Sequence, residues 1–275
     1  MLIQKNAGWK VVIGDLNVKG GEAVAEKLGK DCVFVKCDAS NYDDVVNIFE
    51  TAKQKFGRVD FGTFPFPPHK RPTLRKSARI AVSLVKKLNR LLIVVAANAG
   101  IAESMDLTKP INVAAGQTPP KPNLKTVDVN LYGPLYAAYL AVHYFRTNSP
   151  ATGGRYVVTS SAAGLYGHID LPLYSAAKFG CVGLVRSLGL DRRCIAENIT
   201  FNAICPGWVE TGLAPPGMIE FVRQNCAEII TPMSTIMRAY NIFLDSNVSA
   251  QAYECTGELA EPRPEPDVFP LPVEC

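Results

Sequence analysis

The sequence has few of the residue patterns that bind metals. It contains only three histidines, His69, His143 and His168, and they lie far apart along the chain. Its eight cysteines include no Cys-x-x-Cys pair, and no histidine lies at zinc-ligand spacing from any of them. We therefore predict no metal site. Because no feature points to secretion, buried free thiols fit the cysteines better than disulfides do.

Long apolar runs are also absent. The longest candidate, Leu91 to Ala97, has seven residues, whereas a membrane-spanning helix needs roughly 20. The first eight residues contain no apolar segment followed by a cleavage site, so they do not resemble a signal peptide. We therefore expect no transmembrane segment and a cytoplasmic protein.

The chain has no general excess of basic residues, although its formal net charge is +4. Residues 61–92 contain eight basic residues and no acidic ones, so the rest of the chain has a net charge of −4. The basicity therefore belongs to one segment, and we predict no nucleic-acid partner. The eight are Lys70, Arg71, Arg75, Lys76, Arg79, Lys86, Lys87 and Arg90.

What the sequence does contain is an alternation of strand-like and helix-like segments. This order predicts an α/β fold, a Rossmann-like doubly wound parallel sheet with helices on both faces. The hydrophobic content of 48% is ample for its core. The predicted strands are 9–15, 32–37, 92–97, 155–159 and 199–204, and the predicted helices are 18–28, 45–56, 122–147, 174–189 and 232–244.

A tyrosine and a lysine follow one of these strands at helical spacing. Tyr174 and Lys178 are four residues apart, so on a helix they share a face and the ammonium can lie close to the phenol. A nearby positive charge stabilises the phenolate and would make Tyr174 a general base. The spacing alone also fits an ordinary amphipathic pair on an exposed helix.

Several segments together resemble the short-chain dehydrogenase/reductase family. In that family a serine lies 13 residues before the tyrosine, and here that residue is Ser161. The resemblance implies that Ser161 holds the substrate oxygen, that Tyr174 transfers the proton, and that Lys178 binds both the phenolate and the nicotinamide ribose. It also gives Asn130 the family's fourth catalytic position, where a kinked helix frees a carbonyl to hold a proton-relay water.

The resemblance further implies a nicotinamide dinucleotide as cofactor. Asp15, at the end of a predicted strand, would accept hydrogen bonds from both ribose hydroxyls and repel a 2′-phosphate, which favours NAD over NADP. Asp38 matches the position that contacts the adenine edge. Each aspartate alone also fits a helix cap or a turn. The other implied cofactor contacts are Asn98, Ala99, Gly100, Tyr174, Lys178, Pro206, Gly207, Val209 and Thr211.

The sequence departs from the family at its start. A dinucleotide fold begins with a strand, a glycine-rich turn and a helix whose N-terminal amides bind the pyrophosphate. Residues 2–8 resemble only the last turns of that helix, and Asp15 directly after Gly14 would repel a phosphate. We therefore expect an N-terminally truncated domain without its phosphate cradle or central strand.

A second departure is the basic insert at 61–92, which begins with a proline-rich stretch. Its later apolar residues are spaced like one face of a helix, with basic residues opposite. Such a helix could bind an anionic surface or a partner. Alternatively, a non-coding stretch has been translated, as in a faulty gene prediction. The apolar residues are Ala81, Leu84, Val85, Leu88 and Leu91.

These features predict one domain over residues 1–257, interrupted by the insert, and an irregular proline-rich tail at 258–275. Residues 214–226 would cover the substrate. The family resemblance, strongest to members that oxidise secondary alcohols with NAD, implies hydride transfer with an alcohol or ketone substrate. It also implies a homo-oligomer that pairs through helices 122–147 and 174–189. The alternative is a catalytically inactive remnant that cannot bind the dinucleotide.

Overall fold

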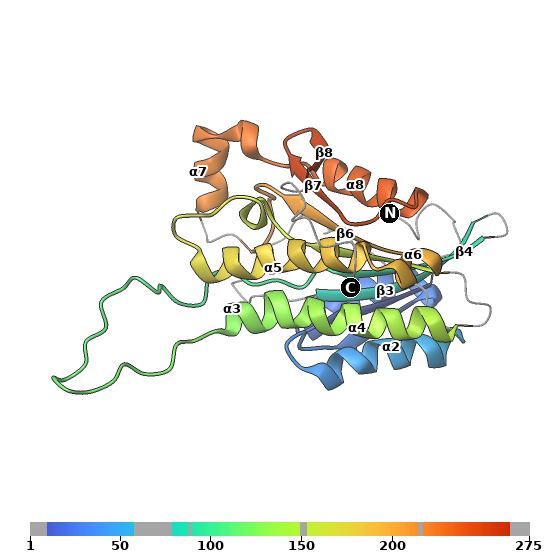
Figure 1. Cartoon of the computed structure of the whole chain (residues 1–275), viewed down its shortest axis with the longest axis horizontal. Helices are drawn as coiled ribbons and strands as arrows, with labels where there is room; N and C mark the ends of the chain where they lie inside the picture. The colour runs from blue at the N-terminus through green and yellow to red at the C-terminus, as the bar shows by residue number, and fades with distance from the viewer. Residues whose placement is uncertain (1–9, 58–78, 88–89, 149–152, 214–216, 265–275) are drawn as a thin grey trace, which may run out of the picture.

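The computed structural model describes residues 10–57, 79–87, 90–148, 153–213 and 217–264 (Figure 1). The predicted helix end at 2–8, the proline-rich part of the insert and the last part of the tail lie outside these residues. Of the seven described cysteines, six are buried and Cys226 is half-buried, and all are free thiols, as predicted. No helix in the described ranges has the length and apolar character needed to cross a membrane.

The described strands form one eight-stranded sheet in the order β2-β1-β3-β4-β5-β6-β7-β8. Neighbours pair in parallel except along β3 and between β7 and β8. The predicted doubly wound α/β fold is therefore confirmed, with an antiparallel strand in its middle. The strands are β1 (Lys10–Asp15), β2 (Cys32–Lys36), β3 (Arg79–Lys87), β4 (Arg90–Ala97), β5 (Gly154–Thr159), β6 (Ile199–Pro206), β7 (Gln251–Thr256) and β8 (Leu259–Arg263).

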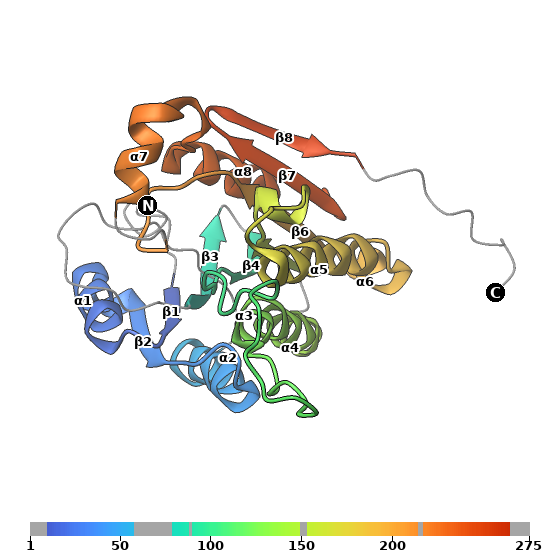
Figure 2. The same ribbon diagram turned by 90° about the vertical axis from the view of Figure 1, so that its left-hand side faces the viewer.

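Helices cover both faces of the sheet (Figure 2). Helices α2, α4 and α5 pack on one face, while α1 and α8 pack on the other. The helices are α1 (Val18–Leu28), α2 (Tyr42–Phe56), α3 (Lys125–Val127), α4 (Gly133–Thr147), α5 (Pro172–Gly189), α6 (Arg192–Ala196), α7 (Met218–Asn225) and α8 (Met233–Asp245). Shorter turns are the 3-10 helices η2 (Gly29–Asp31), η4 (Ala162–Gly164) and η5 (Ala227–Ile229) and the π-helical turn η3 (Asp128–Tyr132).

Strand β1 shows why the strands were recognisable from the sequence. Val12 packs in the core beneath α2, whereas Val11 and Ile13 pack with α1 on the opposite face. A strand that is buried on both faces has a continuous apolar run, as these residues do. Asn41 caps α2 by accepting from the amides of Asp43 and Asp44, so the helix starts three residues earlier than predicted, at Tyr42.

Two parts of the sequence prediction are wrong. Residues 79–87 of the insert form strand β3 and not an amphipathic helix, so the proposed cationic helix loses its structural basis. The strand pairs in antiparallel register with β1 on one side and β4 on the other. The tail is not irregular throughout, because Leu259–Arg263 forms the edge strand β8 against β7. Pro262 is tolerated there because an edge strand has unpaired N–H positions.

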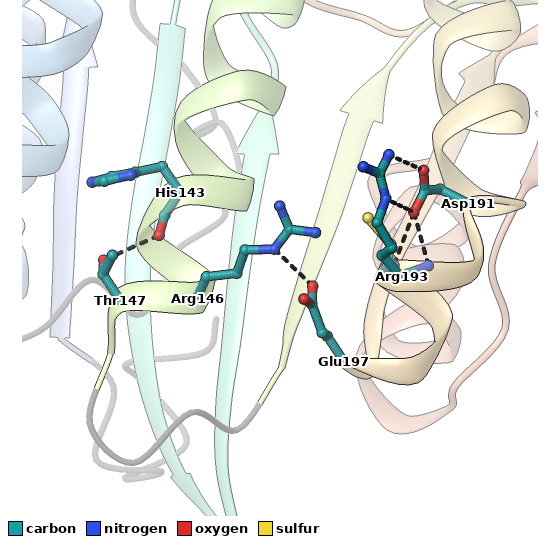
Figure 3. Close-up of polar contacts among 7 residues, drawn as sticks. His143, Arg146, Thr147, Asp191, Arg193 and Glu197 are labelled. Carbon is teal, nitrogen blue, oxygen red and sulfur yellow. Dashed lines mark hydrogen bonds and ion pairs between the residues drawn. The ribbon is translucent and has the colours of Figure 1, made fainter.

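At the amino edge of the sheet, one ion pair links α4 to the residue after α6, and a second pair lies at the start of α6 (Figure 3). Arg146, in the last turn of α4, donates through Nε to Oε2 of Glu197 at 2.8 Å, just beyond α6. Asp191 caps α6 by accepting from the amides of Arg193 and Cys194. The hydrogen bond from the Arg193 side chain also lowers the pKa of Asp191. These partly exposed pairs lie far from the carboxyl edge, where the site residues lie, and add little stability.

Candidate active site

Helix α5 places Tyr174 and Lys178 together. The Lys178 Nζ lies 5.5 Å from the centre of the Tyr174 ring, so the two share a helix face as predicted. Lys178 is only 3% exposed, and its Nζ donates to the carbonyl of Thr159 at 2.8 Å, at the end of β5. The lysine charge is therefore held beside the half-buried tyrosine ring and away from bulk water.

The two serines that follow β5 lie directly beneath this helix. Ser160 is buried and donates its hydroxyl to the carbonyl of Lys178 at 2.8 Å. Ser161 is half-buried, and its Oγ accepts from the amide of Ala163 at 3.1 Å. A side chain at Gly164 would put its Cβ 2.4 Å from the Ser160 Oγ, so glycine is required for this close approach. The Ser160 hydroxyl is therefore used inside the fold, and the role implied for Ser161 stays a prediction.

Asn130 lies in the π-helical turn η3 between α3 and α4, within the range predicted as one long helix. Its Oδ1 accepts from the amide of Ile101 and its Nδ2 donates to the carbonyl of Ile101, both at 2.8 Å. The thiol of Cys181 donates to the Asn130 carbonyl at 3.2 Å. Burial raises the pKa of Cys181, so this thiol stays protonated and able to donate. π-Helical turns are frequent at functional sites.

The loop after β4 runs beside these groups. A Cβ built on Gly100 would lie 3.6 Å from both the Asn130 Oδ1 and the Lys178 Nζ, so Gly100 adjoins both. Ala99 is buried and Asn98 is half-buried. Three residues beyond Gly100, Oε2 of Glu103 accepts from the amide of Tyr174 at 2.9 Å.

The turn after β6 forms the next part of the carboxyl edge. Gly207 donates its amide to the carbonyl of Cys255 at 2.8 Å, which fixes the turn to β7. Val209 packs against the core beneath α8, and the Thr211 Oγ1 accepts from the amide of Leu213. Pro206 ends β6 and is buried. The four predicted residues of this turn therefore lie in one short segment at the end of the strand next to β5.

Helix α7 forms part of the segment predicted to cover the substrate, and it is held to this turn by charge. Arg223 on α7 donates through Nη2 to Oε2 of Glu210 at 2.8 Å and through Nε to Oε1 at 2.5 Å. A bidentate arginine–carboxylate pair fixes direction as well as distance. Both side chains are partly exposed, so the pair orients α7 without adding much stability.

The two aspartates predicted to bind the adenosine lie across β3 from this cluster. Asp15 ends β1, is 0% exposed, and accepts from the amide of Asn17 at 2.8 Å. In the backbone register it lies opposite Arg79, the first residue of β3. The structure therefore places Asp15 at the carboxyl edge, as predicted, but covers it.

Asp38 takes part in a capping network between α2 and α3. Its Oδ1 accepts from the amide and hydroxyl of Ser40, and its Oδ2 accepts from the Lys125 Nζ at 3.2 Å. Partial burial opposes ionisation of Asp38, but these hydrogen bonds from Ser40 and Lys125 lower its pKa overall. The alternative role of Asp38, as a turn or capping aspartate, thus has direct structural support.

The structure therefore brings some predicted residues together and separates others. Asn130, Ser161, Tyr174, Lys178 and Gly100 lie around the carboxyl ends of β4 and β5. This arrangement can hold a substrate oxygen and move its proton. The aspartates lie on the other side of β3, and no group of three potential metal ligands occurs among the described residues. Sequence reasoning missed Ile101, Glu103 and Cys181, because contacts over 29, 71 and 51 residues leave no local pattern.

The residues present fit one half of a nicotinamide dinucleotide better than the other. At the β4–β5 side, the buried Lys178 lies beside Gly100. Because glycine has no Cβ, no side chain at position 100 fills the space next to the Lys178 Nζ. On the β1 side, α1 follows β1, but the middle strand β3 runs antiparallel and leads to β4, and no helix between them occurs among the described residues. Lys178 and the loop at Asn98–Gly100 would hold the nicotinamide side, and Asp15 must be uncovered to meet a ribose.

Comparisons with known proteins bear on the whole chain. The family model described as short chain dehydrogenase matches residues 73–217, and a model described as enoyl-(acyl carrier protein) reductase matches residues 3–63. The short-chain dehydrogenase/reductase prx6 of Penicillium rubens is 30% identical over 258 residues, which are 91% of this chain and 73% of that protein. The 15-hydroxyprostaglandin dehydrogenase [NAD(+)] of Bos taurus is 23% identical over 248 residues, with 88% and 74% covered.

A solved structure has a similar fold. The 3-ketoacyl-(acyl-carrier-protein) reductase from Brucella melitensis, crystallised with NADH, superposes with a TM-score of 0.63. The match covers 88% of this chain and 84% of that one, at 20% sequence identity. This likeness supports the fold and carries no residue roles.

Proposed function

Because the chain belongs to the short-chain dehydrogenase/reductase family of oxidoreductases, we propose that it transfers a hydride between a secondary alcohol or ketone and NAD. The observation that carries this proposal is the placement of Tyr174 and Lys178 on α5, beside Ser161 at the end of β5. A phenol next to a buried ammonium is suited to acid–base work. The Bos taurus relative, named as an NAD(+) enzyme that oxidises a hydroxyl group, points the same way.

In the proposed oxidation, Ser161 donates a hydrogen bond to the substrate oxygen and Tyr174 takes the hydroxyl proton. The Lys178 charge stabilises the phenolate that accepts this proton. NAD, when bound, supplies the acceptor at nicotinamide C4 for the hydride that leaves the carbinol carbon. The alcohol is thereby oxidised to a ketone, and Tyr174 then releases the proton to solvent. In the reverse direction the same tyrosine returns the proton.

The preference for NAD over NADP rests on Asp15. A carboxylate at the end of β1 repels a 2′-phosphate and accepts from ribose hydroxyls. This proposal requires Asp15, fully covered in the free protein, to become accessible when the dinucleotide binds.

A second candidate function is a catalytically inactive member of the family. The observations that favour it are the covered Asp15 and the antiparallel strand at the point where a dinucleotide would cross the sheet. In this case the catalytic cluster persists without a cofactor.

Titration with NADH, followed by nicotinamide fluorescence, separates the two. The enzyme proposal predicts saturable binding that Asp15→Ala weakens about tenfold, the loss of one good charged hydrogen bond. Tyr174→Phe should still bind NADH saturably, although it loses the hydroxyl of an implied cofactor contact, while its turnover of secondary alcohols falls about 10²- to 10⁴-fold. Tyr139→Phe, which alters a 70% exposed tyrosine on α4, is the matched control.

Absence of NADH binding in the unaltered protein would support the inactive alternative. Turnover that survives Tyr174→Phe would contradict the proposed role of the tyrosine, whatever the cofactor result.

A further inference from the structure

The first turn of α5 has an unusual amino-terminal cap. Pro172 occupies the first helical position and has no N–H, and the amide of Ser175 donates to the carbonyl of Leu171 at 2.8 Å. Leu171, at the capping position, offers no side-chain acceptor. The amide of Tyr174 is instead bound by Glu103, whose Oε2 accepts at 2.9 Å from a loop 71 residues earlier in the chain. Glu103 therefore acts as a remote cap on the residue proposed as general base.

The loop that carries Glu103 is fastened on both sides of it. Before it, the amide and carbonyl of Ile101 are both bound by the Asn130 side chain. After it, the Ser104 hydroxyl donates to the carbonyl of Asn123 at 2.9 Å, which closes the base of the long loop that projects at the left of Figure 1. Glu103 thus joins a fixed loop to the catalytic helix.

The second oxygen of this carboxylate shows that the contact is kept at an energetic cost. Among the described residues, the buried Oε1 of Glu103 has no hydrogen-bond partner. Burying a carboxylate oxygen without a donor is unfavourable, and such groups are rare in folded proteins. A methionine of similar length would fill the same space without that cost. Stability alone therefore does not account for glutamate at position 103.

We propose that Glu103 is a positioning residue that holds the backbone of Tyr174 so that its phenol stays aligned with Ser161 and Lys178. A carboxylate suits this place, because the amino end of a helix carries partial positive charge. The inference rests on the proposed function for its catalytic consequence, but the contact itself does not.

The test compares Glu103→Met with Glu103→Gln. Glutamine keeps one oxygen for the Tyr174 amide, whereas methionine keeps the volume and loses the acceptor. In Glu103→Met we expect at least about tenfold faster hydrogen exchange at the Tyr174 amide and a Tm that is unchanged or raised. The kcat for alcohol oxidation should fall about tenfold while the Kd for NADH stays the same. In Glu103→Gln, hydrogen exchange at the Tyr174 amide and kcat should stay close to those of the unaltered protein. Glu228→Met, at an exposed glutamate, should also change neither quantity.

Two results would overturn the inference. One is exchange at Tyr174 that is as slow in Glu103→Met as in the unaltered protein. The other is a lowered Tm with kcat preserved, which would make Glu103 a structural residue only. If the unaltered protein binds no NADH, the proposed function fails, whereas the exchange measurement still decides whether Glu103 holds Tyr174.

Discussion

Strand β3 divides the sheet into two parts, with β4 to β8 on one side and β1 and β2 on the other. The two parts differ in how their strands are connected. From β4 to β7 the strands are parallel, and their neighbours in the sheet follow one another in the chain. The side chains that hold the candidate site, Asn130 on Ile101 and Lys178 on Thr159, belong to this side. On the other side, β1 and β2 are also parallel, but they join the rest only through the antiparallel β3.

Strand β3, which joins the two sides, lies where this class of fold binds its ligands. In an open α/β sheet, ligands bind outside the carboxyl ends of the strands where the strand order reverses. Here the chain passes outward from β1 to β2 and, on the other side, from β4 to β7, so the reversal lies at β3. The candidate catalytic residues all lie on the β4–β7 side, whereas the aspartates predicted to bind the adenosine lie on the β1–β2 side, beyond β3.

If β3 holds the two parts of the sheet together, Val82→Pro in β3 should cause the largest loss of stability. Val82 pairs with Val12 of β1 and with Val95 of β4. Since β3 has an antiparallel neighbour on each side, each of its interior amides faces one partner strand, and proline removes that donor. We expect a loss of at least about 3 kcal/mol in the free energy of unfolding, measured by urea denaturation.

Val82→Ala is the matched control, because it keeps the amide and changes only the side chain. If Val82→Pro and Val82→Ala unfold at the same urea concentration, β3 does not hold the two sides together, and β1 and β2 must be attached in another way.

On the side that carries the candidate site, Asn130→Ala should cause a smaller loss of stability. Asn130→Ala leaves the buried amide and carbonyl of Ile101 without partners. An unsatisfied buried group costs at least about 1 kcal/mol, so we expect the loss of both partners to lower the free energy of unfolding by at least about 2 kcal/mol in urea denaturation. The exposed Asn225, which bonds the carbonyl of Phe221 on α7, provides the control, and Asn225→Ala should stay within about 0.5 kcal/mol. Equal effects of the two substitutions would show that the loop after β4 is not fastened by Asn130.

Most of the fold could be predicted from the sequence because local signals agreed with long-range packing. Continuous apolar runs marked the strands, and α8 and α1 lie where the periodicity placed them. In the insert, the local signal and the long-range packing disagreed. Apolar residues spaced like Ala81, Leu84 and Val85 fit a helix face, yet short apolar runs cannot be assigned by periodicity alone. Residues 79–87 form a strand because they pair with β1 on one side and β4 on the other, and this pairing cannot be seen in the local sequence.

The candidate site was predictable to the extent that the family motif fixes it. Tyr174 and Lys178 share a helix face, as their spacing predicted, and Asn130 lies in the π-helical turn η3. The supporting residues were not predictable. Glu103 and Cys181 contact the site across long stretches of chain, and single residues of these types carry no recognisable pattern.

The smallest effects compare one glycine from each side. Gly57 ends α2 with φ at 77°, and a Cβ there would meet nothing within 4 Å, so Gly57→Ala tests backbone strain alone. We expect it to lower the free energy of unfolding by about 1 kcal/mol. Gly183 lies in the interior of α5, is exposed and has equal space, so Gly183→Ala should raise it by about 0.5 to 1 kcal/mol. Urea denaturation measures both. A loss from Gly183→Ala that grows with protein concentration would instead mean that another copy packs against α5, as the family resemblance implies, because no atom of the described residues meets the added methyl group.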